Sequence, residues 1–241
     1  MSKLSDAIRK HNHHFCTVVV AAAGSSTRMG RDKLVLELGG MPVLARTLLA
    51  LERCDAVDEI IAVTRSEALE TVSAMKERYG LQKLAGVVLG GETRTRSALA
   101  GVSEASPRAR VICIHDGARP FVSDAVIRDA VHNAVLYKAA APAIPVKDTI
   151  KVAENGVVRQ TPERSSLFAV QTPQAFQPEL IKAALTKAVQ TGISYTDDCA
   201  AVEAMGVQVH LSQGSEDNIK ITTPADLVLA DLILCRAEAE K

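Results

Sequence analysis

Short apolar runs alternate with segments of helical periodicity from Val18 to Tyr137. The strand-like runs are Val18–Ala23, Glu59–Val63, Gly86–Leu89 and Val111–His115. Between and after them, we expect helices over Pro42–Glu52, Glu67–Tyr79 and Thr95–Ala105, and from the N-cap Ser123 to Tyr137. Strands that are apolar throughout and separated by helices predict an α/β fold, with a mostly parallel sheet covered by helices on both faces.

The pattern changes after Ala139. A strand is expected over Ala141–Val146, followed by two β-like runs joined through Asn155-Gly156, a strong hairpin signal. Further on, we expect strands over Leu167–Gln171 and Val207–Leu211, and helices over Pro178–Gln190, Thr196–Ala204 and Pro224–Cys235. The sequence therefore predicts an N-terminal lead-in over residues 1–16 and a single domain over 17–236, with a β-arm inserted at about 141–166.

Composition excludes several classes of partner. The 241 residues carry a formal net charge of zero and no Trp, which argues against nucleic acid or an anionic membrane surface as the main partner. Five scattered cysteines without a C-x-x-C pair predict reduced core thiols in a cytoplasmic protein. The N-terminal stretch has no apolar segment typical of a signal peptide. Its cluster of His11, His13 and His14 is read as a solvated lead-in, with metal binding as the alternative.

The segment Thr17–Lys33 leaves the first apolar run through a loop of small residues that begins at Gly24 and ends in basic side chains. Small residues let backbone N–H groups approach an anion, and the cations neutralise its charge. The segment matches neither G-x-x-x-x-G-K-[ST] nor G-x-G-x-x-G. We predict that it binds the phosphates of a nucleoside triphosphate; the alternative is an ordinary strand-to-helix turn with basic surface residues.

Two other stretches follow strand-like runs and have polar side chains. Asp116 leaves a strand at the edge where open α/β sheets bind ligands, and a carboxylate beside phosphates suits Mg²⁺. Gly90 and Gly91 permit a close approach of ligand, so Ser97 would read a base edge. A capping residue at Asp116, or a glycine turn before a helix, explains either stretch equally well when it is taken alone.

A third stretch, Ser215–Thr222, brings Asp217 and Lys220 close together after a strand, although a surface ion pair is an equal explanation. The stretches gain meaning as a set because they occur in a fixed order: AAAGSSTRMG, GGETRTRS, HDGARPF, PVKDTIK, QTPQAF, YTDD and DNIKIT. This set resembles the 2-C-methyl-D-erythritol 4-phosphate cytidylyltransferases, the CTP-using enzymes of the non-mevalonate isoprenoid pathway, over Thr17–Leu234.

The resemblance implies a Rossmann-like nucleotidyltransferase fold with a projecting β-arm, and a homodimer in which the arms clasp. It implies transfer of the cytidylyl group of CTP to 2-C-methyl-D-erythritol 4-phosphate, with release of pyrophosphate. Neither nucleic acid nor a membrane is expected as a partner.

The resemblance also implies roles for individual residues. For the CTP triphosphate these are Ala22, Ala23, Gly24, Ser25, Arg28 and Lys33, of which Arg28 and Lys33 would stabilise the transition state. For cytosine and ribose they are Gly90, Gly91, Ser97 and Gly117. Asp116 would bind Mg²⁺ or another divalent cation with help from Asp217, and Lys220 would contact the α-phosphate. The methylerythritol phosphate site would comprise Arg119, Thr149, Thr172, Thr196 and, from the partner subunit's arm, Arg164.

One departure from the family pattern affects the phosphate loop. The family commonly has R-M-x-x-x-x-P-K-Q, whereas Arg28–Lys33 is two residues shorter and lacks Pro and Gln. Lys33 is the expected equivalent of the family lysine, and Arg31 is the alternative.

Three other functions remain open from the sequence. A ribitol-5-phosphate or other alditol-phosphate cytidylyltransferase would share the CTP loop and differ in the acceptor pocket. A nucleotide-binding sensor would keep the fold without catalysis. A Rossmann oxidoreductase is the weakest alternative because the glycine fingerprint of dinucleotide binding is missing.

Overall fold

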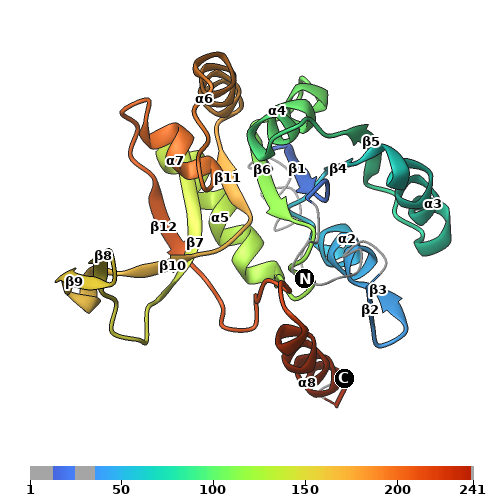
Figure 1. The fold of residues 1–241 in the computed structure, drawn as a ribbon. Helices are drawn as coiled ribbons and strands as arrows, with labels where there is room; N and C mark the ends of the chain where they lie inside the picture. Colours follow the sequence, from blue (N-terminus) through green and yellow to red (C-terminus); the bar gives the residue numbers. More distant parts are fainter. Residues whose placement is uncertain (1–12, 25–35, 240–241) are drawn as a thin grey trace, which may run out of the picture.

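A central sheet of eight strands organises the computed structural model, which describes residues 13–24 and 36–239. The strand order is β10-β7-β11-β6-β1-β4-β5, with β12 beside β7 (Figure 1). The parallel part comprises β1 (Cys16–Ala21), β4 (Glu59–Thr64), β5 (Leu84–Leu89) and β6 (Val111–Asp116). The antiparallel pairings join β6, β7 (Ala139–Pro145), β10 (Phe168–Val170) and β11 (Gln174–Phe176).

Helices cover both faces of the sheet, as predicted. Successive residues of a strand point to opposite faces, so Val18 and Val20 pack in one core and Val19 in the other. The first core receives α2 (Val43–Arg53), α3 (Leu69–Tyr79) and α5 (Asp124–Tyr137). The second receives α4 (Arg94–Glu104), α6 (Pro178–Thr191) and α7 (Asp198–Glu203).

Local signals explain where these helices begin and end. The Ser123 side chain accepts a hydrogen bond from the backbone of Val126, which confirms it as the N-cap of α5. Gly80 ends α3 with a positive φ of 66°, as expected for a glycine C-cap. The predicted helix from Thr196 begins only at Asp198, because Asp197 caps it by accepting from the backbone of Ala200.

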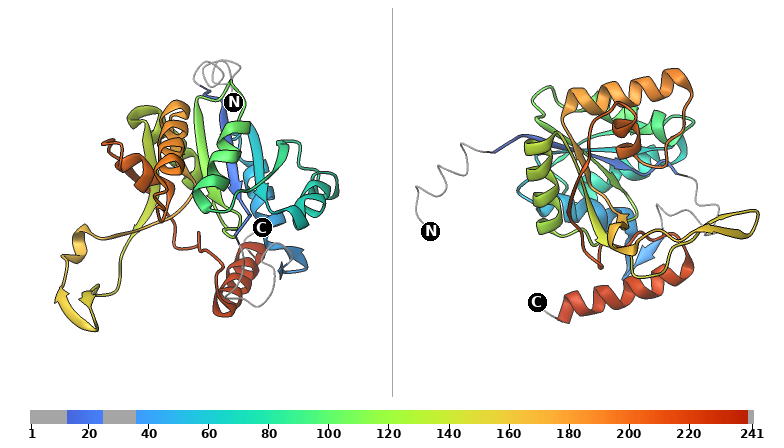
Figure 2. Two further views of the ribbon diagram at one scale, coloured as in Figure 1. Left: turned by 45° about the horizontal axis from the view of Figure 1, so that its top comes forward. Right: turned by 90° about the vertical axis from the view of Figure 1, so that its left-hand side faces the viewer.

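The hairpin predicted at Asn155-Gly156 is present. Both residues have positive φ, 51° and 78°, and join β8 (Val152–Glu154) to β9 (Val157–Gln160). The hairpin projects from the body of the molecule (Figure 2). We expected the arm to begin at about 141, but β7 remains in the main sheet as far as Pro145, where it pairs with Phe168. The projecting part of the chain is therefore shorter than expected.

Other elements differ from expectation in position. The short strands β2 (Glu37–Leu38) and β3 (Met41–Pro42), the 3-10 turns Ser66–Ala68 and Arg164–Ser166, and β11 were not predicted as separate elements. The strand expected over Val207–Leu211 is β12, at His210–Gln213, because pairing with β7 rather than apolar content determines its limits. Four cysteines are buried as expected, whereas Cys235 is exposed.

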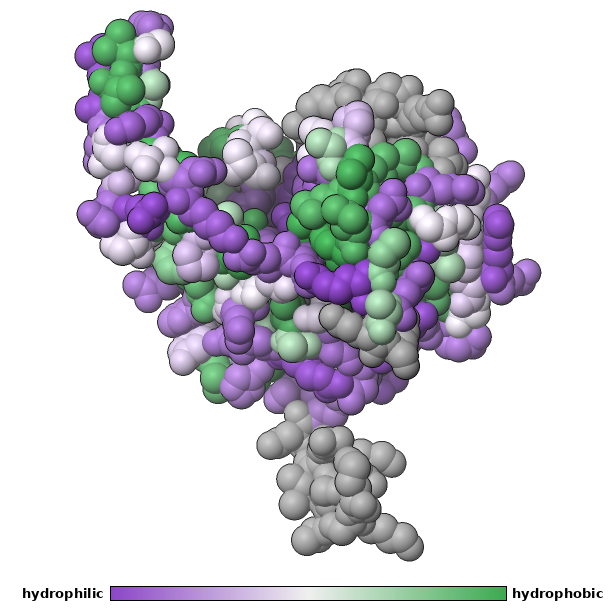
Figure 3. Space-filling view, turned by 90° about the horizontal axis from the view of Figure 1, so that it is seen from below, coloured by the Kyte–Doolittle hydropathy of each residue, from purple (hydrophilic) through white to green (hydrophobic). Residues whose placement is uncertain are grey.

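The last helix, α8 (Pro224–Ala239), is four residues longer than the expected end at Cys235. Thr223 and Asp226 form a reciprocal cap: Asp226 accepts from the backbone of Thr223 at 2.8 Å, and Thr223 accepts from that of Asp226 at 3.4 Å. Its exposed apolar side chains are Val228, Leu229 and Leu232. Figure 3 views the molecule from below, which is the side where α8 lies in Figure 1. No helix in the described ranges is long and apolar enough to cross a membrane.

A buried histidine connects strand β6 to the segment that precedes β11. His115 is fully buried, and its Nε2 lies 3.3 Å from the carbonyl of Arg119, which can only accept. Nε2 therefore carries the proton, and Nδ1 accepts from the Thr172 hydroxyl at 3.0 Å. That hydroxyl in turn accepts from the backbone N–H of Asp116 at 3.0 Å. The ring thus fixes the backbone on which Asp116 is presented.

Burial lowers the pKa of His115 from 6.5 to about 4, so the unfolded chain binds more protons between these two values. The stability that His115 contributes is complete above pH 6.5 and is lost as the pH falls toward 4. We expect the free energy of unfolding to fall by about 3 kcal/mol more in the wild type than in His115→Gln across this window. Urea unfolding without divalent cations checks this difference; parallel pH profiles would contradict it.

Candidate active site

A cleft of about 700 Å³ opens at the carboxyl ends of β1 and β6. From β1 the chain continues through β4 and β5 on one side, whereas β6 lies on the other. Ligands of open α/β sheets bind at such a reversal of strand order. The described residues that line the cleft are Ala21, Ala22, Ala23, Gly24, Leu44, Gly91, Glu92, Thr93, Arg94, Ser97, Ala98, Ile114, Asp116, Gly117, Ala118, Lys220 and Thr222.

The cleft brings together most of the residues predicted to bind CTP. Ala22, Ala23, Gly24, Gly91, Ser97, Asp116 and Gly117 line the cleft, together with the predicted catalytic Lys220. Ser25, Arg28 and Lys33, with the alternative Arg31, lie outside the described residues. Their roles stay predictions.

The side of the cleft formed by Gly90–Ser97 is tightly built. A Cβ on Gly90 would lie 2.7 Å from the Cβ of Ala23 and 2.8 Å from the Oγ of Ser97, so a side chain there would displace one of them. The Ser97 hydroxyl accepts from the backbone of Gly91 at 3.1 Å and lies 3.0 Å from the Thr93 carbonyl. Gly90 therefore supports the wall without lining the cleft itself.

The opposite side contains a carboxylate held between two cations. Asp116 accepts from Lys220 Nζ at 3.0 Å through Oδ1 and from Arg119 Nε at 3.1 Å through Oδ2. Burial by itself would raise the pKa of Asp116, but the charges of Lys220 and Arg119 outweigh it and hold that pKa below its ordinary value. The carboxylate is consequently ionised at neutral pH.

An ionised Asp116 in the cleft suits a divalent cation. Each of its two oxygens accepts a hydrogen bond from one cationic side chain, and each has a second lone pair with which it could bind a metal. Mg²⁺ is commonly held by one or two carboxylates together with substrate phosphates. Within residues 13–24 and 36–239, no group of three His, Cys, Asp or Glu side chains could hold a metal by itself. The donor set therefore fits a metal that arrives with a nucleotide.

Asp217, the second predicted metal residue, does not line the cleft. Its carboxylate lies 2.6 Å from Arg236 of α8 and is about half exposed. Arg119, predicted to bind the acceptor, is mostly buried, and it donates to Asp116 and to the carbonyl of Asn218 at 2.6 Å. Thr172 is also buried, with its hydroxyl between Asp116 and His115. These two residues make hydrogen bonds with Asp116 and do not themselves line the cleft.

The remaining predicted acceptor residues lie apart from the cleft within this chain. Thr149 and Arg164 are exposed residues of the arm, and Arg164 donates to the carbonyl of Lys147 at 3.1 Å. Thr196 is exposed just before α7. None of the three lines the cleft.

Sequence reasoning gave no role to Arg94, which lines the cleft. Both terminal nitrogens of Arg94 donate to the carboxylate of Asp198, at 2.8 and 2.5 Å. GGETRTRS contains Arg94 and YTDD contains Asp198, but the two residues are 104 positions apart. Arg94 stands immediately before the predicted helix Thr95–Ala105, and the structure places it in the first turn of α4, where a cation is unfavourable.

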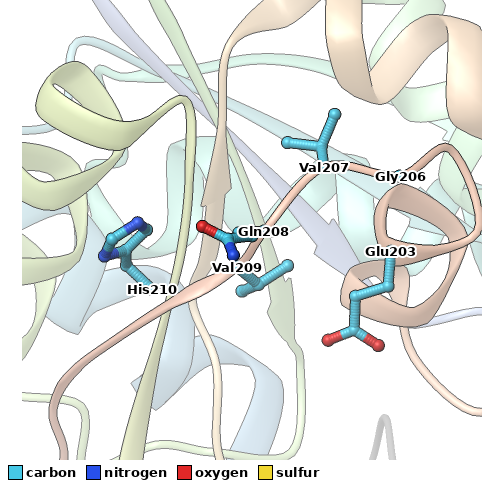
Figure 4. A pocket seen from close by; sticks show the side chains of 6 residues that line it. All are labelled: Glu203, Gly206, Val207, Gln208, Val209 and His210. Atoms are coloured by element: carbon cyan, nitrogen blue, oxygen red, sulfur yellow. The ribbon is translucent and has the colours of Figure 1, made fainter.

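A second cavity, of about 500 Å³, lies between the end of α7 and β12 (Figure 4). Its lining residues are Glu203, Gly206, Val207, Gln208, Val209 and His210. It presents a carboxylate and no lysine or arginine, so it does not suit a triphosphate.

Comparisons with known proteins show which family the chain belongs to. The sequence profile of the 2-C-methyl-D-erythritol 4-phosphate cytidylyltransferase family matches residues 16–236. The enzyme of that name from Caldanaerobacter subterraneus subsp. tengcongensis is 45% identical over 222 residues, which are 90% of this chain and 98% of the relative. That from Geobacillus kaustophilus is 44% identical over 224 residues, 92% of this chain and 98% of the relative.

Solved structures give the same result. The 4-diphosphocytidyl-2C-methyl-D-erythritol synthase of Anaerococcus prevotii superposes with a TM-score of 0.82 at 32% identity, covering 93% of this chain and 98% of its own. The 2-C-methyl-D-erythritol 4-phosphate cytidylyltransferase of Thermus thermophilus gives 0.72 at 31% identity, covering 92% and 99%. The family profile, the fold and these relatives together show that the chain belongs to the 2-C-methyl-D-erythritol 4-phosphate cytidylyltransferase family.

Proposed function

We propose that this protein transfers the cytidylyl group of CTP to 2-C-methyl-D-erythritol 4-phosphate, giving 4-diphosphocytidyl-2-C-methyl-D-erythritol and pyrophosphate. The observation that carries the proposal is the cleft at the β1–β6 reversal, where a glycine-rich edge faces the Asp116–Lys220 pair. Relatives that match nearly end to end bear the name of this activity.

In the reaction, an oxygen of the acceptor phosphate attacks the α-phosphorus of CTP, and the bond from that phosphorus to the bridging oxygen of pyrophosphate breaks. The second pKa of a phosphate monoester is about 6, so the attacking oxygen is already ionised at neutral pH. No general base is required. The main barrier is the approach of two polyanions, which positioned cations lower.

The residues divide this work between them. Gly24 and Gly91 let the nucleotide approach the backbone, and Ser97 lies at the base side. Lys220 contacts the α-phosphate, and Arg28 and Lys33 (or Arg31) act on the triphosphate. Asp116 would hold Mg²⁺ together with the CTP phosphates. Asp217, predicted as the second acidic group, is paired with Arg236 outside the cleft and would have to leave that arginine to reach the metal. When bound, the ion neutralises phosphate charge in the transition state.

The acceptor site is completed across a homodimer in this proposal. The arm exposes apolar side chains, including Val157 (58% exposed) and Val158 (54%), as expected of a surface that a second subunit covers. An isolated two-stranded hairpin is marginally stable in water, which also favours a partner. Thr149 and Arg164 of that arm would then reach the partner subunit next to its cleft, on the side where Thr196 is exposed before α7 and where Arg119 and Thr172 support Asp116.

Pyrophosphate release tests the proposed function and its nearest rivals together. We expect turnover with CTP and 2-C-methyl-D-erythritol 4-phosphate, and at least a hundredfold lower kcat/KM with ribitol 5-phosphate or with ATP, UTP or GTP. A preference for ribitol 5-phosphate would assign an alditol-phosphate cytidylyltransferase instead. Binding of CTP without turnover with either acceptor would assign a nucleotide-binding sensor.

Lys220→Met removes the cation beside Asp116 without opening the core, since the lysine side chain is 41% exposed. We expect kcat to fall by about two to three orders of magnitude, as for the loss of other groups that stabilise transition-state charge. The melting temperature should fall only modestly, because Arg119 still pairs with Asp116. Lys182→Met, at an exposed position of α6, is the matched control and should leave kcat unchanged. A kcat for Lys220→Met within fivefold of wild type would refute the role of Lys220.

Arg164→Ala tests whether the arm serves the partner's site. We expect a higher KM for the acceptor, with CTP affinity retained. In heterodimers of Arg164→Ala and Lys220→Met subunits, one site has both side chains intact, so about half of the wild-type activity should return. At an acceptor concentration well below the wild-type KM, confirmed heterodimers no more active than the average of their two parents would show that Arg164 acts within its own subunit.

A further inference from the structure

The ion pair between Arg94 and Asp198 joins two parts of the molecule, one proposed to bind the nucleotide and the other proposed to bind the acceptor. Arg94 is the first residue of α4 and follows Gly90–Thr93, on the nucleotide side of the cleft. Asp198 is the first residue of α7 and follows Thr196, a proposed acceptor residue. Its carboxylate receives both terminal nitrogens of the guanidinium.

The carboxylate of Asp198 is in an unfavourable place for a charge. Its side chain is fully buried, and burial raises the pKa of Asp198 above its ordinary value although the hydrogen bonds and charge of Arg94 oppose this. Arg94 is equally out of place, because a cation in the first turn opposes the helix dipole and α4 has no acidic residue there. Buried ion pairs add little to stability compared with apolar residues of similar volume. Stability alone therefore does not account for this pair.

The position of Asp198 is fixed by other buried contacts. Gln174 of β11 accepts from the backbone N–H groups of Asp198 and Cys199, both at 3.1 Å, and donates to the Asp197 carboxylate at 2.8 Å. β11 pairs directly with β6, the strand that presents Asp116. Asp198 is thus anchored to the sheet, whereas the side chain of Arg94 is about one-third exposed and lines the cleft.

From this geometry we propose that Asp198 is a positioning residue that acts through Arg94. The ion pair holds the loop Gly90–Thr93, on the nucleotide side of the cleft, at a fixed distance from the segment before α7 that contains Thr196. The inference rests on the proposed function. The bidentate geometry fixes the plane of the guanidinium of Arg94, a residue that lines the cleft, so its remaining N–H groups keep one orientation. Without Asp198, Arg94 would no longer connect α4 to α7, and both substrates would bind to a less ordered site.

The test separates this role from structural bracing by removing the pair without destabilising the fold. Arg94→Met with Asp198→Leu replaces the ion pair by apolar residues of similar size, so the melting temperature should be kept or raised. We expect this double variant to raise the Kd of CTP, measured by calorimetry, and the KM of the acceptor, each about tenfold. Asp198→Leu, Asp198→Asn and Arg94→Met alone should each produce the same change, because the two residues act as one unit.

Two controls complete the experiment. Arg96→Gln removes a positive charge from the same turn of α4 at an exposed position and should leave both constants within twofold of wild type. Asp198→Glu keeps the charge and should recover most of the affinity that Asp198→Asn loses.

The inference is overturned if the double variant keeps either constant within twofold of wild type, or if the effects of the single variants add up in it. Failure of the proposed function gives a different result: the wild-type chain itself would then not bind CTP, or would bind it without turning over 2-C-methyl-D-erythritol 4-phosphate.

Discussion

A single carboxylate, that of Asp116, connects the elements that form the cleft. It is the last residue of β6, and it holds Lys220 from the segment after β12 and Arg119 from its own turn. Arg119 extends the connection to the carbonyl of Asn218. The two cations keep the carboxylate ionised despite its burial. In the proposed function, a triphosphate and its metal engage the same three charges, so the contacts that hold the site together are also those proposed to bind the ligand.

The position of these residues at one edge of the sheet was predictable because they follow strands. Gly24, Gly91 and Asp116 come directly after apolar runs, and parallel strands bring their carboxyl ends to one edge of the sheet. The alternation of strands and helices fixed the parallel half for the same reason. The hairpin was equally clear, since Asn155 and Gly156 adopt the positive φ angles that such a turn requires.

The parts that sequence reasoning missed depend on contacts between distant segments. Asp198 looks like an ordinary surface acid in YTDD, and only the fold places it, fully buried, against Arg94. Likewise, β11 is three residues long, and its pairing with both β6 and β7 defines it as a strand. The antiparallel half of the sheet was therefore harder to predict than the parallel half, where continuous apolar runs mark each strand.

A crystal structure of the chain with CTP and Mg²⁺ tests the central claim most directly. We expect the triphosphate between Gly24 and Lys220, a metal ion on Asp116, and cytosine against Gly91 and Ser97. A nucleotide bound in the cavity beside Glu203, or one with its base at Asp116 and its phosphates at Ser97, would contradict it.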